Sequence, residues 1–131
     1  MIQRDYIQRM IQQFAELTAK LLHLPLAQRI ETVGAAFEQY AALSLPDALA
    51  LSPEDLLTAL TGQRQLDWTR VEFLGKLLSK AGELSLQQQN PERAHRLFER
   101  ALACLDYADT ESGMYDPERL ALIEDVRARV G

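Results

Sequence analysis

Few residues in this chain have the types and spacing that catalysis or metal binding requires. Glu92 and His95 form a Glu-x-x-His pair, a spacing that supplies two ligands from one helix in di-iron helix bundles. Such a centre needs a second pair, but the other histidine, His23, has Lys20 three residues before it. Glu92 also falls opposite the apolar stripe of its expected helix. We therefore expect no cofactor, and metal binding by Glu92 and His95 is the last-ranked alternative.

Nucleophilic catalysis is not expected either. Cys104 and His95 would lie on one helix about half a turn out of phase, so they face opposite ways. Cys104 lies at the edge of the apolar stripe and is predicted to be a small buried hydrophobic residue. Adjacent carboxylates diverge by about 100° on a helix, so they do not converge on one substrate atom. Such pairs occur at positions 54–55 and 124–125. The sequence predicts a protein that is not an enzyme.

The amino-acid composition narrows the functional classes that remain for this protein. A chain of 131 residues with 47% hydrophobic and 25% charged residues fits a single helical domain over 1–131. The net charge of -5 argues against nucleic-acid binding, which needs clustered Lys and Arg. No apolar run approaches the length of a membrane span. With Cys104 as the only cysteine, a disulfide within the chain is excluded, and we expect a cytoplasmic protein.

The elements that would position any site are all predicted to be helices. Apolar periodicity and end signals give about six helices and no strand. Three starts share one signature, a capping side chain followed by Pro and an acid, as in Ser52-Pro53-Glu54. Short connections favour antiparallel neighbours. The expected ranges are 2–23, 26–43, 53–61, 68–88, 91–108 and 117–130, with an exposed loop over 109–116.

Glycine positions add an expectation about packing. Gly34 falls inside the second predicted helix, where glycine costs up to about 1 kcal/mol relative to alanine. We interpret it as a place where a neighbouring helix approaches closely. Gly82, Ala94 and Ala101 are small residues on two successive helices, with Phe98 between them in the pattern. Two antiparallel helices could therefore pack tightly there.

The segment from Leu78 to Ala101 resembles one helix pair of the tetratricopeptide family. Ser85 stands where that family usually has an aromatic residue, and Asp106 stands where it usually has a final proline. The segment from Leu17 to Tyr40 resembles a second, degenerate pair in which large residues replace the small ones. The resemblance implies all-α helical hairpins, arranged as a right-handed α-α superhelix or bundle.

A second resemblance concerns the opening of the chain. Met1-Ile2-Gln3-Arg4-Asp5-Tyr6-Ile7, with Leu51-Ser52-Pro53-Glu54-Asp55-Leu56-Leu57 further on, is similar to an uncharacterised family of small bacterial helical proteins. That resemblance implies a helical fold and a bacterial source, and it carries no activity.

These observations favour an adaptor or scaffold module that binds a protein or peptide in a groove between stacked helices. The alternative is a structural module that forms a homodimer. Aromatic residues at loops and helix starts are the best candidates for partner contact. The residues expected to contact a partner are Tyr6, Arg9, Trp68, Leu74, Lys76, Lys80 and Tyr115.

Overall fold

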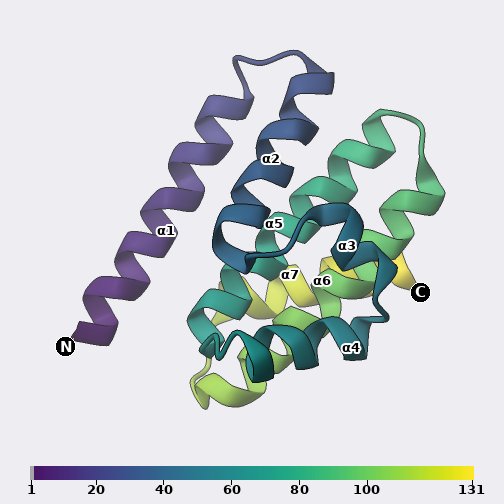
Figure 1. Ribbon diagram of the computed structural model, residues 1–131. Coiled ribbons are helices and arrows are strands. Elements are labelled where there is room, and N and C mark those ends of the chain that lie inside the picture. Colours follow the sequence, from purple (N-terminus) through teal and green to yellow (C-terminus); the bar gives the residue numbers. More distant parts are fainter. Residues whose placement is uncertain (1) are drawn as a thin grey trace.

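The computed structural model describes the backbone of residues 2–131 and the side chains from Asp5 onward. Met1, with which the quoted opening motif begins, lies outside the described residues. Over the described part the chain is all-α, with seven α-helices and one π-helical turn, η1 (Figure 1). The elements are α1 (Ile2–Leu21), α2 (Leu26–Ala41), α3 (Leu45–Ala50), α4 (Pro53–Thr58), η1 (Ala59–Gln63), α5 (Trp68–Gln87), α6 (Pro91–Ser112) and α7 (Pro117–Val130).

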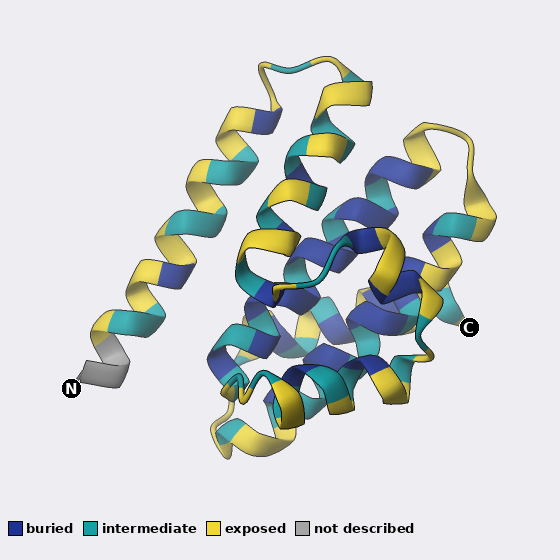
Figure 2. Ribbon diagram, viewed as in Figure 1, coloured by how far each residue is buried: buried dark blue, intermediate teal, exposed yellow. Residues whose placement is uncertain are grey.

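The centre of the fold is the antiparallel pair of α5 and α6. Their buried faces hold most of the fully buried side chains, which appear as the dark segments of Figure 2. The two helices approach closely because glycines of α5 face bulky side chains of α6. A Cβ atom at Gly82 would lie 2.6 Å from the Phe98 ring, and one at Gly75 would lie 3.0 Å from Leu105. The predicted close packing of small residues around Phe98 is therefore confirmed.

The other helices attach to this pair. Val33, Phe37 and Ala41 of α2 are buried with it, and α7 adds Ile123 and Val126. The C-terminal end of the short α3 is fastened to α6 through backbone carbonyls. Arg100 is buried and donates to the carbonyls of Ala48, Leu49 and Leu51, the last at 2.6 Å. All three carbonyls lie at the C-terminal end of α3, where a helix leaves its last carbonyl groups without partners four residues further on.

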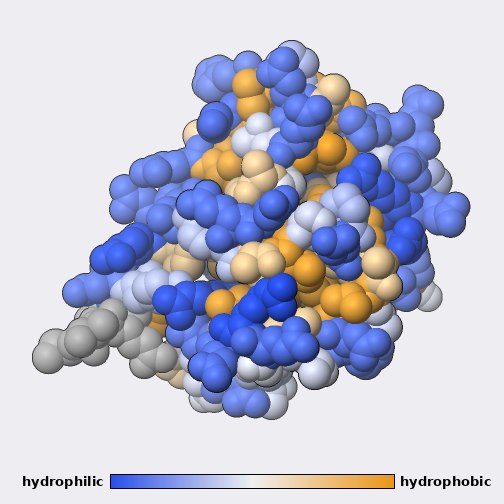
Figure 3. Space-filling model, viewed as in Figure 1, coloured by the Kyte–Doolittle hydropathy of each residue, from blue (hydrophilic) through white to orange (hydrophobic). Residues whose placement is uncertain are grey.

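The helix α1 is the least embedded element. Among its described side chains only Met10 and Leu21 are buried, although α1 is as long as α5. Figure 1 shows its N-terminal half running away from the body of the molecule, and hydrophilic residues dominate it on the face shown in Figure 3. The predicted outer face, which includes Asp5, Arg9 and Lys20, is exposed as expected.

The predicted helices are confirmed with small shifts at their ends, and one helix was missed. Helix α3 begins at the cap Ser44, whose side chain accepts from the Asp47 amide, with Pro46 in its first turn. This start resembles the signature that identified three other helices, but its proline stands one position later. The expected loop over 109–116 is shorter, because α6 continues to Ser112 and ends at Gly113 in the left-handed region, with φ of 64°. In the described residues, no helix has the length and apolar character to cross a membrane.

The interpretation of Gly34 is wrong. A Cβ atom there would meet only one side-chain atom of Leu45, at an ordinary 4.0 Å. No neighbouring backbone therefore requires a glycine at this position.

We predict that Gly82→Ala destabilises the protein by about 1–3 kcal/mol, because the added methyl group must displace the buried Phe98 ring. The matched control is Gly34→Ala, which has room for the methyl group and gains helix propensity of up to about 1 kcal/mol. Urea unfolding followed by circular dichroism measures both variants. Equal stability of the two variants would refute the close α5–α6 contact.

Candidate functional site

A groove with a volume of about 610 Å³ runs along the inner face of α1. We call it the α1 groove. One wall is α1, the floor is α5, and the other wall is the α6–α7 loop with the start of α7. Its lining residues are Ile7, Ile11, Phe14, Ala15 and Thr18 of α1, Trp68, Glu72, Lys76, Ser79, Lys80 and Glu83 of α5, and Met114 to Arg119 with Leu122.

The groove displays apolar side chains that the fold leaves uncovered. Ile11 is 56% exposed, Met114 is 57% exposed and Tyr115 is 81% exposed. Among the described residues only two other large hydrophobic side chains, Leu22 and Leu86, are comparably exposed. Three of these five side chains therefore line one groove, and such clustering of apolar surface marks an interaction site.

The loop wall is held in place by Arg119 of α7. This arginine is only 3% exposed, and its guanidinium donates to Glu72 of α5 and, at 3.2 Å, to Asp109 of α6. It also donates to the Met114 carbonyl at 3.3 Å and forms an ion pair with Asp116. One side chain therefore ties the loop that carries Met114 and Tyr115 to two helices.

The electrostatics of this cluster favour a permanently charged Arg119. Burial alone would lower the pKa of Arg119, but the hydrogen bond and charge of Glu72, with Asp109 and Asp116, raise that pKa above its usual value. The guanidinium also lies 5.4 Å from the ring centre of Trp68, a cation–π contact. Trp68 is the only tryptophan in the sequence, so its fluorescence reports on this groove.

The charges of the groove are placed unevenly. The α1 wall contributes no charged lining residue, whereas α5 contributes Lys76 and Lys80, one helical turn apart, together with Glu72 and Glu83. The opposite wall contributes Asp116, Glu118 and Arg119. Lys80 lies 3.2 Å from Glu83. Lys76 lies 3.8 Å from Glu72, whose other oxygen is held by Arg119. The Lys76 ammonium therefore shares the Glu72 carboxylate with Arg119, which binds it more strongly.

Four of the seven residues expected to contact a partner line the groove: Trp68, Lys76, Lys80 and Tyr115. Leu74 must be removed from that set, because it is fully buried in the core and faces away from the surface. Arg9 is exposed but lies on the outer face of α1. Tyr6 is half-buried and lies under Arg70, 4.5 Å from ring centre to guanidinium carbon.

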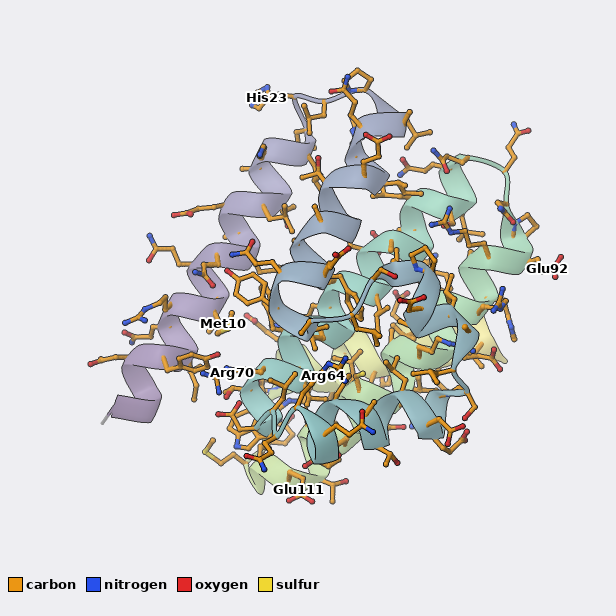
Figure 4. All side chains as sticks on the ribbon, in the orientation of Figure 1. Met10, His23, Arg64, Arg70, Glu92 and Glu111 are labelled. Carbon is orange, nitrogen blue, oxygen red and sulfur yellow. The ribbon has the colours of Figure 1, made fainter. Side chains whose placement is uncertain are left out.

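The residues considered for metal binding lie apart. Figure 4 shows His23 at the α1–α2 turn and Glu92 at the start of α6, pointing outward. His95 donates through Nε2 to the Val130 carbonyl at 2.9 Å, and its Nδ1 lies 3.6 Å from Glu99. Across the described part of the chain, no three His, Cys, Asp or Glu side chains gather as a metal site requires.

Cys104 is not placed for nucleophilic chemistry. Its side chain is fully buried, and burial raises the pKa of the thiol to about 12. The nucleophilic thiolate is therefore scarce at neutral pH. The prediction that Cys104 is a small buried hydrophobic residue is confirmed.

Two features of the site were missed from the sequence. Arg119 stands in helical phase with the buried Ile123 and Val126 of α7, and a charged residue within an apolar stripe predicts a buried ion pair. That pattern was present in the sequence. The exposure of Ile11 had no such signal, because its spacing on α1 is that of a core-facing residue.

Comparison with known proteins found no match: no family model, curated protein or solved structure matches this chain. The resemblances to tetratricopeptide pairs and to small bacterial helical proteins therefore stay predictions.

We predict that Arg119→Met lowers the free energy of unfolding by about 3 kcal/mol, the low end for removing one partner of a buried ion pair. The low end applies because Asp109 and Asp116 are partly exposed. The control is Arg127→Met on the same helix. Arg127 is 59% exposed and pairs with Asp106, so its loss should cost less than about 1 kcal/mol.

Urea unfolding followed by Trp68 fluorescence measures both variants. The folded Arg119→Met protein should also show an altered Trp68 emission, because the guanidinium above the indole is gone. If both variants have the same stability and emission, Arg119 does not organise the groove.

We predict that Cys104 resists thiol reagents in the native protein and reacts at the rate of unfolding. Its raised pKa also means that the folded state binds this proton more tightly than the unfolded state. The resulting stability is present below pH 9, the ordinary thiol value, and is lost as the pH rises toward about 12. Reaction with a chromogenic disulfide at pH 8, with and without urea, checks the reactivity. Fast reaction without urea would contradict the buried position.

Proposed function

We propose that this protein is a non-catalytic adaptor or scaffold module whose α1 groove binds an amphipathic helix of a partner protein. The observation that carries the proposal is the grouping of the exposed Ile11, Met114 and Tyr115 around one groove. Aromatic residues and Met are enriched at interface centres, and Trp68 and Phe14 add two aromatic residues to the lining.

The dimensions of the groove support a helix as its occupant. The α1 wall from Ile7 to Thr18 is about 16 Å long, which matches three turns of a bound helix. A volume of about 610 Å³ accommodates one row of side chains rather than a whole helix. The occupant therefore inserts an apolar stripe and keeps its polar face in water, as in helix-in-groove recognition.

Charge further defines the partner. The α1 edge of the groove contributes no lining charge, and the α5 edge presents Lys76, whose nearest acid is shared with Arg119. We expect the partner helix to carry a carboxylate on the edge that faces α5. Opposite charges across an interface fix the orientation of binding more than its strength.

Related predictions accompany this function. We infer that α5 and α6 form a tetratricopeptide-type pair, supported by the close contact of Gly82 with Phe98. A cytoplasmic location and a bacterial source stay predictions. Homodimerisation, the alternative function, enters as an outcome of the experiment below.

We predict that Ile11→Ser and Tyr115→Ala each weaken partner binding at least about tenfold, because each removes about 1.4 kcal/mol or more from an apolar contact. The control is Leu22→Ser, which removes a 70% exposed apolar side chain outside the groove. Affinity capture from the host with wild-type and Leu22→Ser protein identifies the partner. Titration of its purified segment, followed by Trp68 fluorescence, gives the affinity for all four proteins.

The segment should become helical on binding, as circular dichroism can show. Equal affinity of the groove variants and the wild type, or a segment that binds without becoming helical, would refute the proposal. Light scattering on the isolated protein tests the alternative occupant. A dimer that Ile11→Ser dissociates would assign the groove to a second copy of the chain and overturn the partner helix.

A further inference from the structure

Few side chains attach α1 to the rest of the molecule. Leu21 is buried there, and Phe14 at mid-helix lies edge-on to Phe73 of α5, with ring centres 6.2 Å apart. Among the described side chains of the N-terminal half, only Met10 is buried, and Tyr6 is half-buried beneath Arg70 of α5. By contrast, α5 has the same length and buries a continuous face along its whole length. Because burial of apolar area is the main source of docking energy, the N-terminal half of α1 is weakly held.

The connection between α1 and α2 has the form of a hinge. The amides of Leu22, His23 and Leu24 each donate to a carbonyl three residues earlier, the weakest at 3.3 Å. Such short turns are less stable than α-helix. On the α2 side, Arg29 fixes Leu24 by donating from Nε to its carbonyl at 2.7 Å. Rotation of α1 is thus confined to a few residues before a firmly held helix.

The groove provides the space for such a rotation. Its volume is about 610 Å³. Ile7 lies about 21 Å along the helix from Leu21, so a rotation of about 10° moves it by about 4 Å. We propose that α1 is a hinged jaw, which turns about Leu22–Pro25 and closes the groove against the loop that carries Met114 and Tyr115.

The driving force for closure comes from the apolar side chains on both walls. Ile11 is exposed on α1, and Met114 and Tyr115 are exposed on the loop. Closure brings the two walls closer together and so reduces the apolar area in contact with water without a partner. The opposing wall does not yield, because Arg119 ties the loop to α5 and α6. The moving part is therefore α1, and the hinge is a property of the isolated chain.

Distances between paired spin labels test this motion in the full-length protein. Spin labels are attached to cysteines that replace the exposed Gln8 and Glu124. They report the distance from the N-terminal half of α1 to α7. The native Cys104 is fully buried and stays unlabelled. We expect a distance distribution with a second component shorter by about 4 Å, the displacement of the lever arm. Two matched pairs, Lys20–Glu124 near the hinge and Glu38–Glu124 from α2, should each give one narrow distance.

A fourth pair separates rotation from unfolding. Labels at Asp5 and Lys20 both lie on α1 and should give one narrow distance of about 22 Å if the helix turns as a rigid body. A single narrow distance for Gln8–Glu124, as narrow as that of the α2 control, would overturn the hinge. A broad Asp5–Lys20 distribution would also overturn it, because α1 would then be melting. Neither result depends on whether the groove binds a partner helix.

Discussion

The close approach of α5 and α6 is the constraint on which the rest of the structure depends. Gly82 and Gly75 allow Phe98 and Leu105 to reach the surface of α5, and this brings the buried faces of both helices together. A closely packed protein interior tolerates little change in side-chain volume. The remaining elements are arranged around this pair: α2 covers one side, α7 another, and Arg100 fastens the C-terminal end of α3 through its carbonyls.

The functional site follows from what this pair leaves uncovered. Helix α5 has more surface than α2, α6 and α7 cover, and α1 spans the remainder only in part. One wall of the resulting groove is fixed because Arg119 gathers Glu72, Asp109 and Asp116 around the α6–α7 loop. The other wall is a helix with few buried side chains. A rigid wall opposite a weakly docked wall suits a site that must admit and then hold another helix.

Much of the fold could be predicted from the sequence because its information is local. Caps such as Ser52 and Asp116 and the apolar spacing locate most helices, and the small residues around Phe98 predict the tight pair. The predictions that failed depend on contacts between residues far apart in the sequence. The interpretation of Gly34 failed because a glycine shows that space exists without showing whether a neighbour fills it. Leu74 was expected at the surface, but tertiary packing decides which face of a helix meets a neighbour. The half-covered stripe of α1 has the same spacing as a fully covered one, so the groove itself could not be read from it.

Native-state hydrogen exchange tests the central claim most directly, which is that α5 and α6 form the framework and α1 is a weakly docked wall. Amides in the middle of α5 and α6 should exchange only through global unfolding, with the full denaturant dependence of that reaction. Amides of α1 should open locally, at a lower free energy and with little dependence on denaturant. If α1 amides share the opening free energy and denaturant dependence of α5, α1 belongs to the framework and the account is wrong.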